Sequence, residues 1–335
     1  MIAIHKSLNG FHPRWVRYCD ENNIPYKIVN CYDNSIIEEL QGCEALLWHF
    51  HHNSVADLHV ARKILFALEH TGLKVFPNFY TAWHFDDKLA QKFLLESLKV
   101  PFINSYVFVE KDKAISWSAK TDYPKVFKLK GGAGSQNVRL VRSATEAKSL
   151  INKAFSSGFK NYDALSNFKE RFRKWRLGKF PFFEVVKSLI RFIIPPNFTK
   201  GLGREYGYVY FQDFIDGNDS DIRIIVINNK AFALKRFVRE NDFRASGSGN
   251  FAFEKENFDD RTLKLAFETA KKLKAQCVAF DFIFLKNNPV IVEISYGFNV
   301  PIYDNCQGFW DENLNWYEGS FNPYGWMIEN IIDKE

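Results

Sequence analysis

The sequence predicts a mixed α/β protein in which an N-terminal parallel sheet precedes domains built on antiparallel strands. Two observations predict this class. Residues 1–85 alternate short apolar strands with helices, which is typical of a parallel sheet covered by helices. Beyond residue 100 the pattern changes to apolar strands paired across short turns, which is typical of antiparallel sheets. The expected class is therefore α/β combined with α+β.

Composition sets the first limits on function. The chain has 335 residues, 46% hydrophobic and 25% charged, which suits a globular protein of two or three domains. The apolar run 189–194 contains Arg191 and is far shorter than the ~20 residues that cross a bilayer. No secretory signal is recognisable, and the five cysteines are scattered without a CxxC pair. We therefore expect a cytoplasmic protein with reduced thiols.

The histidines and the charges are unevenly distributed. All eight histidines lie within the first 84 residues, which excludes a histidine triad or histidine–metal site built in the rest of the chain. The net charge is +6, but residues 160–204 alone carry eleven Lys and Arg against three Asp and Glu, a local +8. The remainder of the chain is therefore at −2, and one segment accounts for the basic character.

The elements follow in order along three expected domains. The first domain, 1–85, holds strands at 1–6, 25–31, 44–50 and 74–77, with helices at 13–22, 35–40 and 55–70. The second domain, 86–205, begins within a helix at 82–98. It contains strands at 105–109, 125–130 and 137–141 and a helix at 145–155. The third domain, 206–335, is rich in strands and has a helix at 258–273.

Residues 278–295 carry the sharpest local signal. Two apolar runs flank Lys286-Asn287-Asn288 and predict a hairpin, which places Asp281 directly opposite Glu293. Two carboxylates about 5 Å apart repel unless a cation lies between them or one is protonated. Ser295 follows on the face of Glu293. Oxygen ligands without His or Cys favour Mg²⁺ or Mn²⁺, and the alternative is a polar row facing solvent.

Residues 221–236 predict a second hairpin. The turn Asn228-Asn229 sets Asp221 opposite Arg236, with Arg223 on the same face. The other face is apolar, so we expect one core face and one charged face. Converging arginines suit phosphate or carboxylate recognition, and a simple cross-strand ion pair is the alternative.

A glycine-rich turn follows the strand 125–130. Residues 131–135 read Gly-Gly-Ala-Gly-Ser, and Lys128 and Lys130 precede them on one face of the strand. Such a turn lets backbone N–H groups approach phosphates, although most such turns are plain hairpins. The segment matches neither the P-loop nor the dinucleotide-binding pattern.

Taken together, these segments resemble the ATP-grasp superfamily of carboxylate–amine ligases. The order is similar: a Rossmann-like domain, a lysine on a helix, a strand leading into a glycine loop, and two charged hairpins. The branch looks similar to the ribosomal-protein glutamate ligase and D-alanine–D-alanine ligase types. The resemblance covers roughly 1–158 and 206–335. It implies an ATP-grasp fold with a Rossmann-like N-terminal domain, a central lid domain that carries the basic insertion, and a C-terminal antiparallel domain.

The resemblance also implies roles for particular residues. Lys88 and Lys128 would bind the nucleotide phosphates, Asp221 would contact the ribose, and Arg236 and Arg244 would hold the transferring phosphoryl group, with Lys128 also counted as catalytic. The loop residues that would close over the phosphates are Gly131, Gly132, Gly134 and Ser135. The segment that would hold adenine is Gln212, Asp213, Phe214 and Ile215. The metal ligands would be Asp281, Glu293 and Ser295.

The chain departs from the family pattern at three positions. Ser295 stands where an asparagine is usual, which weakens the second metal position because a hydroxyl is a poorer ligand than an amide carbonyl. Leu129 replaces a proline after the glycine-loop lysine. Ser246 replaces an asparagine after Arg244, and Asn250 is close enough in sequence to compensate.

The insertion 159–205 interleaves its basic residues with aromatic ones. Residues 160–204 hold nine aromatics, and an apolar stripe on a predicted helix includes Val185, Val186, Leu189, Ile190 and Ile193. This pattern suits an anionic membrane surface or a lipid-linked substrate. A helical insertion that packs on the core and has a solvated basic face is the alternative with the greater weight, and nucleic acid is the least favoured partner.

The resemblance implies a ligase that uses ATP and Mg²⁺ or Mn²⁺ to activate a carboxylate as an acyl phosphate, which an amine then attacks. The partners expected are a small carboxylate and an amine, with a bacterial surface-glycan precursor, in capsule or O-antigen synthesis and carried on lipid, as the preferred acceptor class. We expect peripheral contact with the membrane and regard a dimer as plausible. Peptide or protein-tail ligation, and a nucleotide-binding module without turnover, are the alternatives. The substrate-contacting candidates are His49, His51, Ser246 and Tyr296.

Overall fold

The computed structural model contains two compact units. It describes residues 1–7, 10–131, 137–160, 164–176, 178, 180–192, 194, 203–239 and 242–332. Unit 1 combines Met1–Phe85, Ala90–Phe102 and Gly217–Glu335, whereas unit 2 combines Asp86–Leu89 and Ile103–Asp216. The expected first and third domains therefore fall within one unit.

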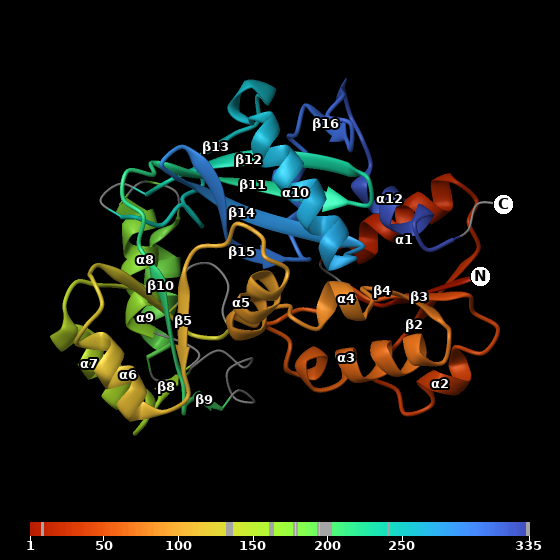
Figure 1. Cartoon of the computed structure of the whole chain (residues 1–335). Coiled ribbons are helices and arrows are strands. Elements are labelled where there is room, and N and C mark those ends of the chain that lie inside the picture. The colour runs from red at the N-terminus through yellow and green to blue at the C-terminus, as the bar shows by residue number, and fades with distance from the viewer. Residues whose placement is uncertain are drawn as a thin grey trace. The chain divides into compact units, whose positions relative to one another are not determined.

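Unit 1 begins with a four-stranded parallel sheet in the order β2-β1-β3-β4. Its strands are β1 (Ile2–His5), β2 (Tyr26–Val29), β3 (Ala45–Leu47) and β4 (Lys74–Phe76). The associated helices are α1 (His12–Glu21), α2 (Ile36–Glu39), α3 (Val55–His70), α4 (Phe79–Ala82) and α12 (Pro323–Glu329). Helices α1 and α12 lie on one face of the sheet and α2 and α3 on the other (Figure 1). The alternating strands and helices predicted from the sequence are confirmed.

The second sheet of unit 1 has seven strands. Their order is β15-β14-β11-β12-β16-β17, and β13 pairs with β12. The strands are β11 (Ser220–Ile227), β12 (Lys230–Phe237), β13 (Phe251–Ala252), β14 (Cys277–Leu285), β15 (Asn288–Ser295), β16 (Gly308–Asp311) and β17 (Trp316–Glu318). A 3₁₀ turn (Lys255–Asn257), α10 (Asp260–Leu273) and α11 (Val300–Tyr303) complete this part. The Asp259 side chain caps α10 by accepting from the Thr262 amide at 2.8 Å.

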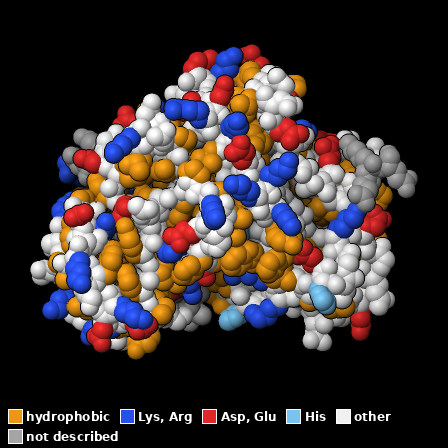
Figure 2. Space-filling model, in the orientation of Figure 1, with side chains coloured by type: hydrophobic (Ala, Val, Ile, Leu, Met, Phe, Trp, Pro, Cys, Tyr) orange, Lys and Arg blue, Asp and Glu red, His pale blue; other side chains and the backbone are white. Residues whose placement is uncertain are grey.

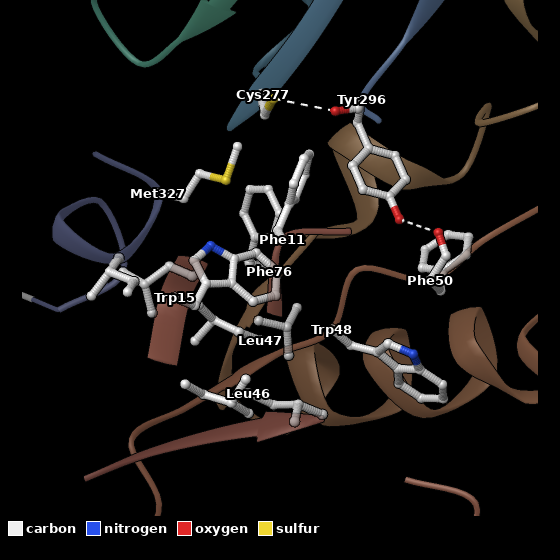
Figure 3. Close-up of a cluster of buried hydrophobic side chains, with 14 of the residues drawn as sticks. Phe11, Trp15, Leu46, Leu47, Trp48, Phe50, Phe76, Cys277, Tyr296 and Met327 are labelled. Atoms are coloured by element: carbon white, nitrogen blue, oxygen red, sulfur yellow. Dashed lines mark hydrogen bonds between the residues drawn. The ribbon is translucent and has the colours of Figure 1, made fainter. Parts of the chain in front are cut away.

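One hydrophobic core joins these two sheets. The expected first and third domains therefore belong to one compact unit. Phe11, which precedes α1, and Trp15 of α1 pack in the same cluster as Leu47 of β3, Cys277 of β14 and Met327 of α12 (Figure 3). A second cluster lies on the opposite face of the seven-stranded sheet, under α10. The sheet is therefore apolar on both faces along most of its length.

Unit 2 contains an antiparallel sheet in the order β5-β10-β6-β7. Its elements are β5 (Ser105–Phe108), α6 (Lys111–Ser118), β6 (Lys125–Lys128), β7 (Arg139–Val141), α7 (Ala144–Ala154) and β10 (Val209–Asp213). The insertion adds α8 (Ala164–Arg176) and α9 (Phe182–Ile190), preceded by β8 (Phe159–Lys160) and followed by β9 (Arg204–Glu205). The two strands pair with each other, so the insertion leaves and re-enters the unit at one place.

Two local predictions were wrong. The helix expected at 82–98 is broken, because Asp86 adopts a positive φ of 54°, and α5 (Lys88–Ser97) begins only after it. Its start is stabilised by Asp87, whose side chain accepts from the Leu89 amide at 3.1 Å. Helix α6 was not predicted. Among the described residues, no helix is long and apolar enough to cross a membrane.

Candidate functional site

Five charged side chains form a row at one end of the seven-stranded sheet; we call Asp221, Arg223, Arg236, Asp281 and Glu293 the charged row. Across the sheet, Asp221 is paired with Arg236, Arg223 with Asp281, and Asp281 with Glu293. Cross-strand partners lie side by side on one face. Both predicted pairings, Asp221 with Arg236 and Asp281 with Glu293, are therefore confirmed.

The pairing of Asp281 with Glu293 depends on an irregularity that the sequence did not reveal. The turn residues Lys286 and Asn287 both have positive φ, and Leu285 pairs with Asn288. This register alone would place Asp281 opposite Val292. A bulge between Asp281 and Phe282 shifts the pairing by one residue and brings Glu293 into position. Bulges are common next to functional sites because they redirect a side chain.

Arg223 and Arg236 bind the two aspartates in a network. Arg223 Nε donates to Asp281 Oδ1 at 2.5 Å and its Nη2 to Asp281 Oδ2 at 3.0 Å. Arg236 Nε and Nη2 donate to Asp221 at 2.6 and 2.8 Å, and Arg236 Nη2 also lies 2.8 Å from Asp281 Oδ2. Planar two-point pairing of this kind fixes both the position and the orientation of the guanidinium groups.

Burial makes these charges strongly interdependent. Burial raises the pKa of Asp281, but the neighbouring Arg223 and Arg236 outweigh it and hold that pKa at about 2. Asp221 differs, because burial raises its pKa more than Arg236 lowers it. Tyr303, which is buried beside the row, has its pKa raised to about 12, mainly by burial. At neutral pH Asp281 is therefore an anion between two arginine cations.

The expectation of one apolar and one charged face on β11 and β12 was only half right. Ile222, Ile224 and Val226 lie in the core under α10 as predicted. The opposite face is charged only near Asp221 and Arg236, because Phe232 and Leu234 on that face belong to the other hydrophobic core. The charged row is thus a polar end of an otherwise apolar sheet.

The loop after β12 places two further arginines. The Arg244 side chain binds Asp242, with Nε 2.9 Å from Oδ1 and Nη2 2.6 Å from Oδ2. Burial acts to raise the pKa of Asp242, but Arg244 outweighs it and lowers that pKa. Arg239 is buried, and its Nε donates to the Ser246 carbonyl at 3.1 Å. Arg239 thereby supports the loop that carries Arg244 and Ser246.

The two other expected metal ligands differ in their surroundings. Glu293 is partly buried opposite Asp281, and its oxygens together with those of Asp281 form the hard donor set that Mg²⁺ prefers. Ser295 is engaged locally, since its Oγ donates to the Gly297 carbonyl at 3.1 Å and accepts from the Gly297 amide at 3.2 Å. Among the described residues, no group of three or more His, Cys, Asp or Glu could hold a metal. The residues present fit a cation that takes its remaining ligands from phosphate oxygens and water.

In unit 2, two buried lysines lie on β6. Lys128 Nζ donates to Gln212 Oε1 at 2.6 Å, and both side chains are almost fully buried. Gln212 in turn donates to the Ser105 hydroxyl at 3.2 Å. Lys125 Nζ donates to Asp213 Oδ1 at 2.6 Å. Lys128 is therefore positioned by the first residue of the expected adenine segment.

Lys88 and Gly131 also meet within unit 2. Lys88 is buried as the first residue of α5, and its amide donates to the Lys130 carbonyl at 3.0 Å. A Cβ added at Gly131 would lie 3.0 Å from Asp86 Oδ2, so glycine permits this close approach. The predicted loop residues Gly132, Gly134 and Ser135 lie outside the described residues. Phe214 and Ile215 follow β10 just before the boundary between the two units at Asp216.

The histidines and Tyr296 belong to the core of unit 1. His49 is buried and stacked on Phe11 with ring centroids 3.7 Å apart, and its Nδ1 accepts from the Phe11 amide at 3.0 Å. Burial is the main cause that lowers the pKa of His49 well below its ordinary value. His51 is half-buried with its ring centroid 4.4 Å from that of His49. Tyr296 is fully buried and donates to the Phe50 carbonyl at 2.7 Å (Figure 3).

His49 and Tyr296 thus lie in the interior of unit 1 and support its packing. The contact of these two side chains with a substrate stays a prediction. The aromatic residues that follow Tyr296 also lie in the interior. Phe298, Tyr303 and Trp310 are buried, which favours packing.

Sequence reasoning missed the roles of two arginines. Arg223 was placed on the charged face but received no role, although it is the main partner of Asp281. The sequence did contain a signal for Arg223, because it lies two residues after Asp221 on one strand and such residues share a face. Arg239 had no such signal, since its burial depends on the irregular loop around Gly247, where a Cβ would lie 2.7 Å from its Nη2.

Known proteins resemble this chain in part of the sequence and in the fold. Residues 205–302, which include both charged hairpins, match the RimK-like ATP-grasp domain. The chain has the ATP-grasp fold. Over 98% of both chains it superposes on a RimK domain ATP-grasp protein from Sphaerobacter thermophilus, with a TM-score of 0.57 and 14% identity. No curated protein matches the sequence.

Two further ATP-grasp structures are similar over most of the chain. The D-alanine–D-alanine ligase of Bacillus anthracis complexed with ATP has a TM-score of 0.52 and 12% identity, covering 88% of this chain and 84% of that one. The ADP complex of N5-carboxyaminoimidazole ribonucleotide synthetase has a TM-score of 0.59 and 14% identity, covering 98% and 75%. The predicted ATP-grasp fold is therefore confirmed, and residues 205–302 are similar to the RimK-like ATP-grasp domain.

Proposed function

We propose that this ATP-grasp protein is an ATP-dependent carboxylate–amine ligase. The carboxylate of one substrate attacks the γ-phosphorus of ATP, which releases ADP and forms an acyl phosphate. The amine of the second substrate then attacks the acyl carbon, which forms an amide and releases phosphate. The observation that supports this most strongly is the charged row, in which two fixed arginine cations lie beside a pair of carboxylates suited to a cation.

The chemistry of phosphoryl transfer needs positioning and positive charge rather than a nucleophilic side chain. Arg236 is buried, permanently charged and oriented by Asp221 and Asp281, so it need not reorganise as charge develops on the phosphoryl oxygens. Arg244 supplies a second guanidinium from the loop after β12. For the nucleotide we propose contacts to Lys88 and Lys128, with Gln212 positioning Lys128.

Asp281 and Glu293 would hold Mg²⁺ or Mn²⁺. The carboxylate of Asp281 takes three contacts from two arginines and keeps about one acceptor position for a cation, because its two oxygens offer about four such positions. When bound, the ion supplies positive charge to the phosphate oxygens of the nucleotide. We propose Ser295 as a support for the backbone at Gly297 rather than as a ligand.

For the acceptor we propose a glycan precursor, of the kind used for bacterial surface polysaccharides and carried on lipid. The support is the insertion 159–205, which combines basic and apolar residues as an anionic lipid carrier requires. The buried aromatic residues near the C-terminus do not support this choice. A peptide or protein tail with acidic residues is the second acceptor class, because the same basic insertion would attract it.

The direct test is Mg²⁺-dependent release of ADP by the purified protein. A panel of amino acids would be supplied with and without uronic-acid sugars, acidic peptides and lipid-linked sugars in vesicles. The proposal predicts release that requires one carboxylate and one amine together. Arg236→Met should lower the rate at least about a hundredfold, as the removal of a charge-stabilising donor does elsewhere.

The matched control is Arg14→Met, which removes an arginine from an exposed ion pair with Asp304 in the same unit. It should leave the rate unchanged. Tight ATP binding without ADP release across the whole panel would instead identify a nucleotide-binding module without turnover.

A further inference from the structure

The helices α8 and α9 of the insertion expose an unusual amount of apolar surface. Of the 22 large hydrophobic side chains exposed in the described part of the chain, ten lie between residues 165 and 194. Six of these are exposed for half or more of their surface: Leu165, Phe182, Phe183, Leu189, Ile190 and Ile194. A segment of 30 residues therefore carries almost half of the exposed apolar side chains, and such a patch normally marks an interaction site.

Helices α8 and α9 already pack against each other, so the exposed apolar side chains do not belong to the face between them. Helices α8 and α9 lie side by side (Figure 1) and pack through an inner face. Val185 and Ser188 of α9 are buried. An Arg171–Glu184 ion pair and the contact of the Trp175 and Phe182 rings, with centroids 5.2 Å apart, join the two helices. The apolar residues that remain exposed are additional to this packed face.

The exposed residues of α9 lie along one side of the helix. Phe183, Val186 and Ile190 are spaced by three and four residues, and Ile194 continues the same spacing beyond the helix end. The face opposite this stripe is the one that packs on α8. The stripe predicted from the sequence is divided in the structure, because Val185 is buried whereas Val186, Leu189 and Ile190 are exposed. Its last member, Ile193, lies outside the described residues.

Positive charge is exposed on both helices of the hairpin. Lys169 and Arg176 of α8 and Lys187 of α9 are exposed, and the segment 160–204 carries a net charge of +8. Figure 2 shows one face of the whole molecule, on which hydrophobic, basic and acidic side chains are interspersed. This pattern contrasts with the remainder of the chain, whose charge is −2. The local charge favours a partner with a dense negative surface.

We propose that the α8–α9 hairpin docks on the surface of an anionic lipid bilayer. The aromatic and aliphatic side chains would enter the headgroup and upper acyl region, while the lysines and arginines would contact the lipid phosphates. Nucleic acid would also attract the positive charge, but it offers no medium in which Phe183, Ile190 and Ile194 would leave water. The exposed aliphatic residues therefore favour a lipid surface over RNA.

This inference goes beyond the proposed function, because membrane docking does not require ligase activity. It gives the lipid-linked acceptor a physical basis, since a docked enzyme would be held at the surface where such an acceptor resides. Each proposal can fail while the other holds, because docking is measured without ATP or substrates.

The test is co-sedimentation of the full chain with phosphatidylcholine vesicles that contain 0% or about 30% phosphatidylglycerol, at low and high salt. The proposal predicts binding to the anionic vesicles that weakens with salt. The double variant Phe183→Asp with Ile190→Asp should weaken it at least about tenfold. The double variant Lys169→Glu with Arg176→Glu should weaken it at least about 25-fold, since each basic residue near such a surface contributes about a fivefold factor.

Matched controls separate docking from general effects of charge and surface polarity. Ile37→Asp changes an equally exposed apolar residue of α2, and Lys111→Glu reverses an exposed charge at the start of α6. Both should bind vesicles like the parent protein, with an unchanged Tm in all variants. The proposal is overturned if the parent protein does not bind anionic vesicles, or if the hairpin variants bind as well as the controls. Retention on RNA or on an acidic polypeptide without vesicle binding would also overturn it, as would a dimer that only the hairpin variants lose.

Discussion

Asp281 is the residue whose replacement tests the charged row most sharply. The substitution Asp281→Asn keeps the size of the side chain but removes the negative charge between Arg223 and Arg236. The side chain of Asp281 is only 13% exposed, so solvent cannot replace the lost interactions. Removing one partner of a buried ion pair costs about 3–5 kcal/mol, because the other charge is left uncompensated.

The pKa of Asp281 gives a second measure of the same effect. The difference between an ordinary pKa of 3.8 and the value of about 2 in the folded chain corresponds to about 2 kcal/mol. Because the folded pKa is the lower one, this stabilisation is fully present above about pH 4. It is lost as the pH falls through about 2, where the folded carboxylate becomes protonated.

We therefore expect Asp281→Asn to lower the free energy of unfolding by about 3 kcal/mol at pH 7 and the Tm by about 5–10 °C. The difference from the parent protein should shrink between pH 4 and pH 2. Scanning calorimetry and urea titration at several pH values measure both effects. Asp304→Asn, which breaks the exposed pair with Arg14, is the matched control and should cost at most about 1 kcal/mol.

A double substitution sharpens this test. Adding Arg223→Met to Asp281→Asn removes one of the two uncompensated cations, so the double variant should be more stable than Asp281→Asn alone. Equal stability of Asp281→Asn and the parent protein, or additive losses in the double variant, would refute the assignment of these residues to one buried network.

Three further outcomes follow from the structure. Lys128→Met should weaken ATP binding at least about tenfold in calorimetric titration, because a buried cation is lost, and Lys113→Met on the surface should not. Tyr296→Phe should cost about 1–3 kcal/mol in unfolding free energy without changing any KM, since its hydroxyl bonds only the Phe50 carbonyl in the core; a large rise in KM would contradict its placement. In the native protein a thiol reagent should modify no cysteine other than Cys43, because burial raises the pKa of the other four thiols. Rapid reaction of several cysteines would contradict the buried arrangement.

The parts of the fold that depend on local patterns were predictable from the sequence. The Asn228-Asn229 turn and the apolar alternation of the flanking strands determined the pairing of Asp221 with Arg236. The pairing of Asp281 with Glu293 was predicted from a turn centred on Asn287, whereas the structure reaches it through a two-residue turn and a bulge. A bulge leaves no mark on the hydrophobic pattern, so the agreement rested on two compensating errors.

Features that depend on distant contacts were beyond the sequence. The burial of Tyr296 and His49 results from packing between the N-terminal sheet and strands β11, β12 and β14, which no local window contains. The break before Lys88 requires the positive φ of Asp86, and an apolar stripe that continues past it conceals the break. The network around Asp281 needed the order β12-β11-β14-β15, which places arginines from one hairpin beside a carboxylate of the other.

The central claim, activation of a carboxylate as an acyl phosphate, is tested most directly by oxygen transfer. The carboxylate that supports ADP release would be labelled with ¹⁸O in both oxygens, and the released phosphate analysed by mass spectrometry. When the carboxylate attacks the γ-phosphorus, one carboxylate oxygen becomes the bridging oxygen of the acyl phosphate. That oxygen leaves with the phosphate when the amine attacks the acyl carbon. The account predicts one ¹⁸O atom in each phosphate released. Unlabelled phosphate, formed at the same rate as the amide product, would contradict it.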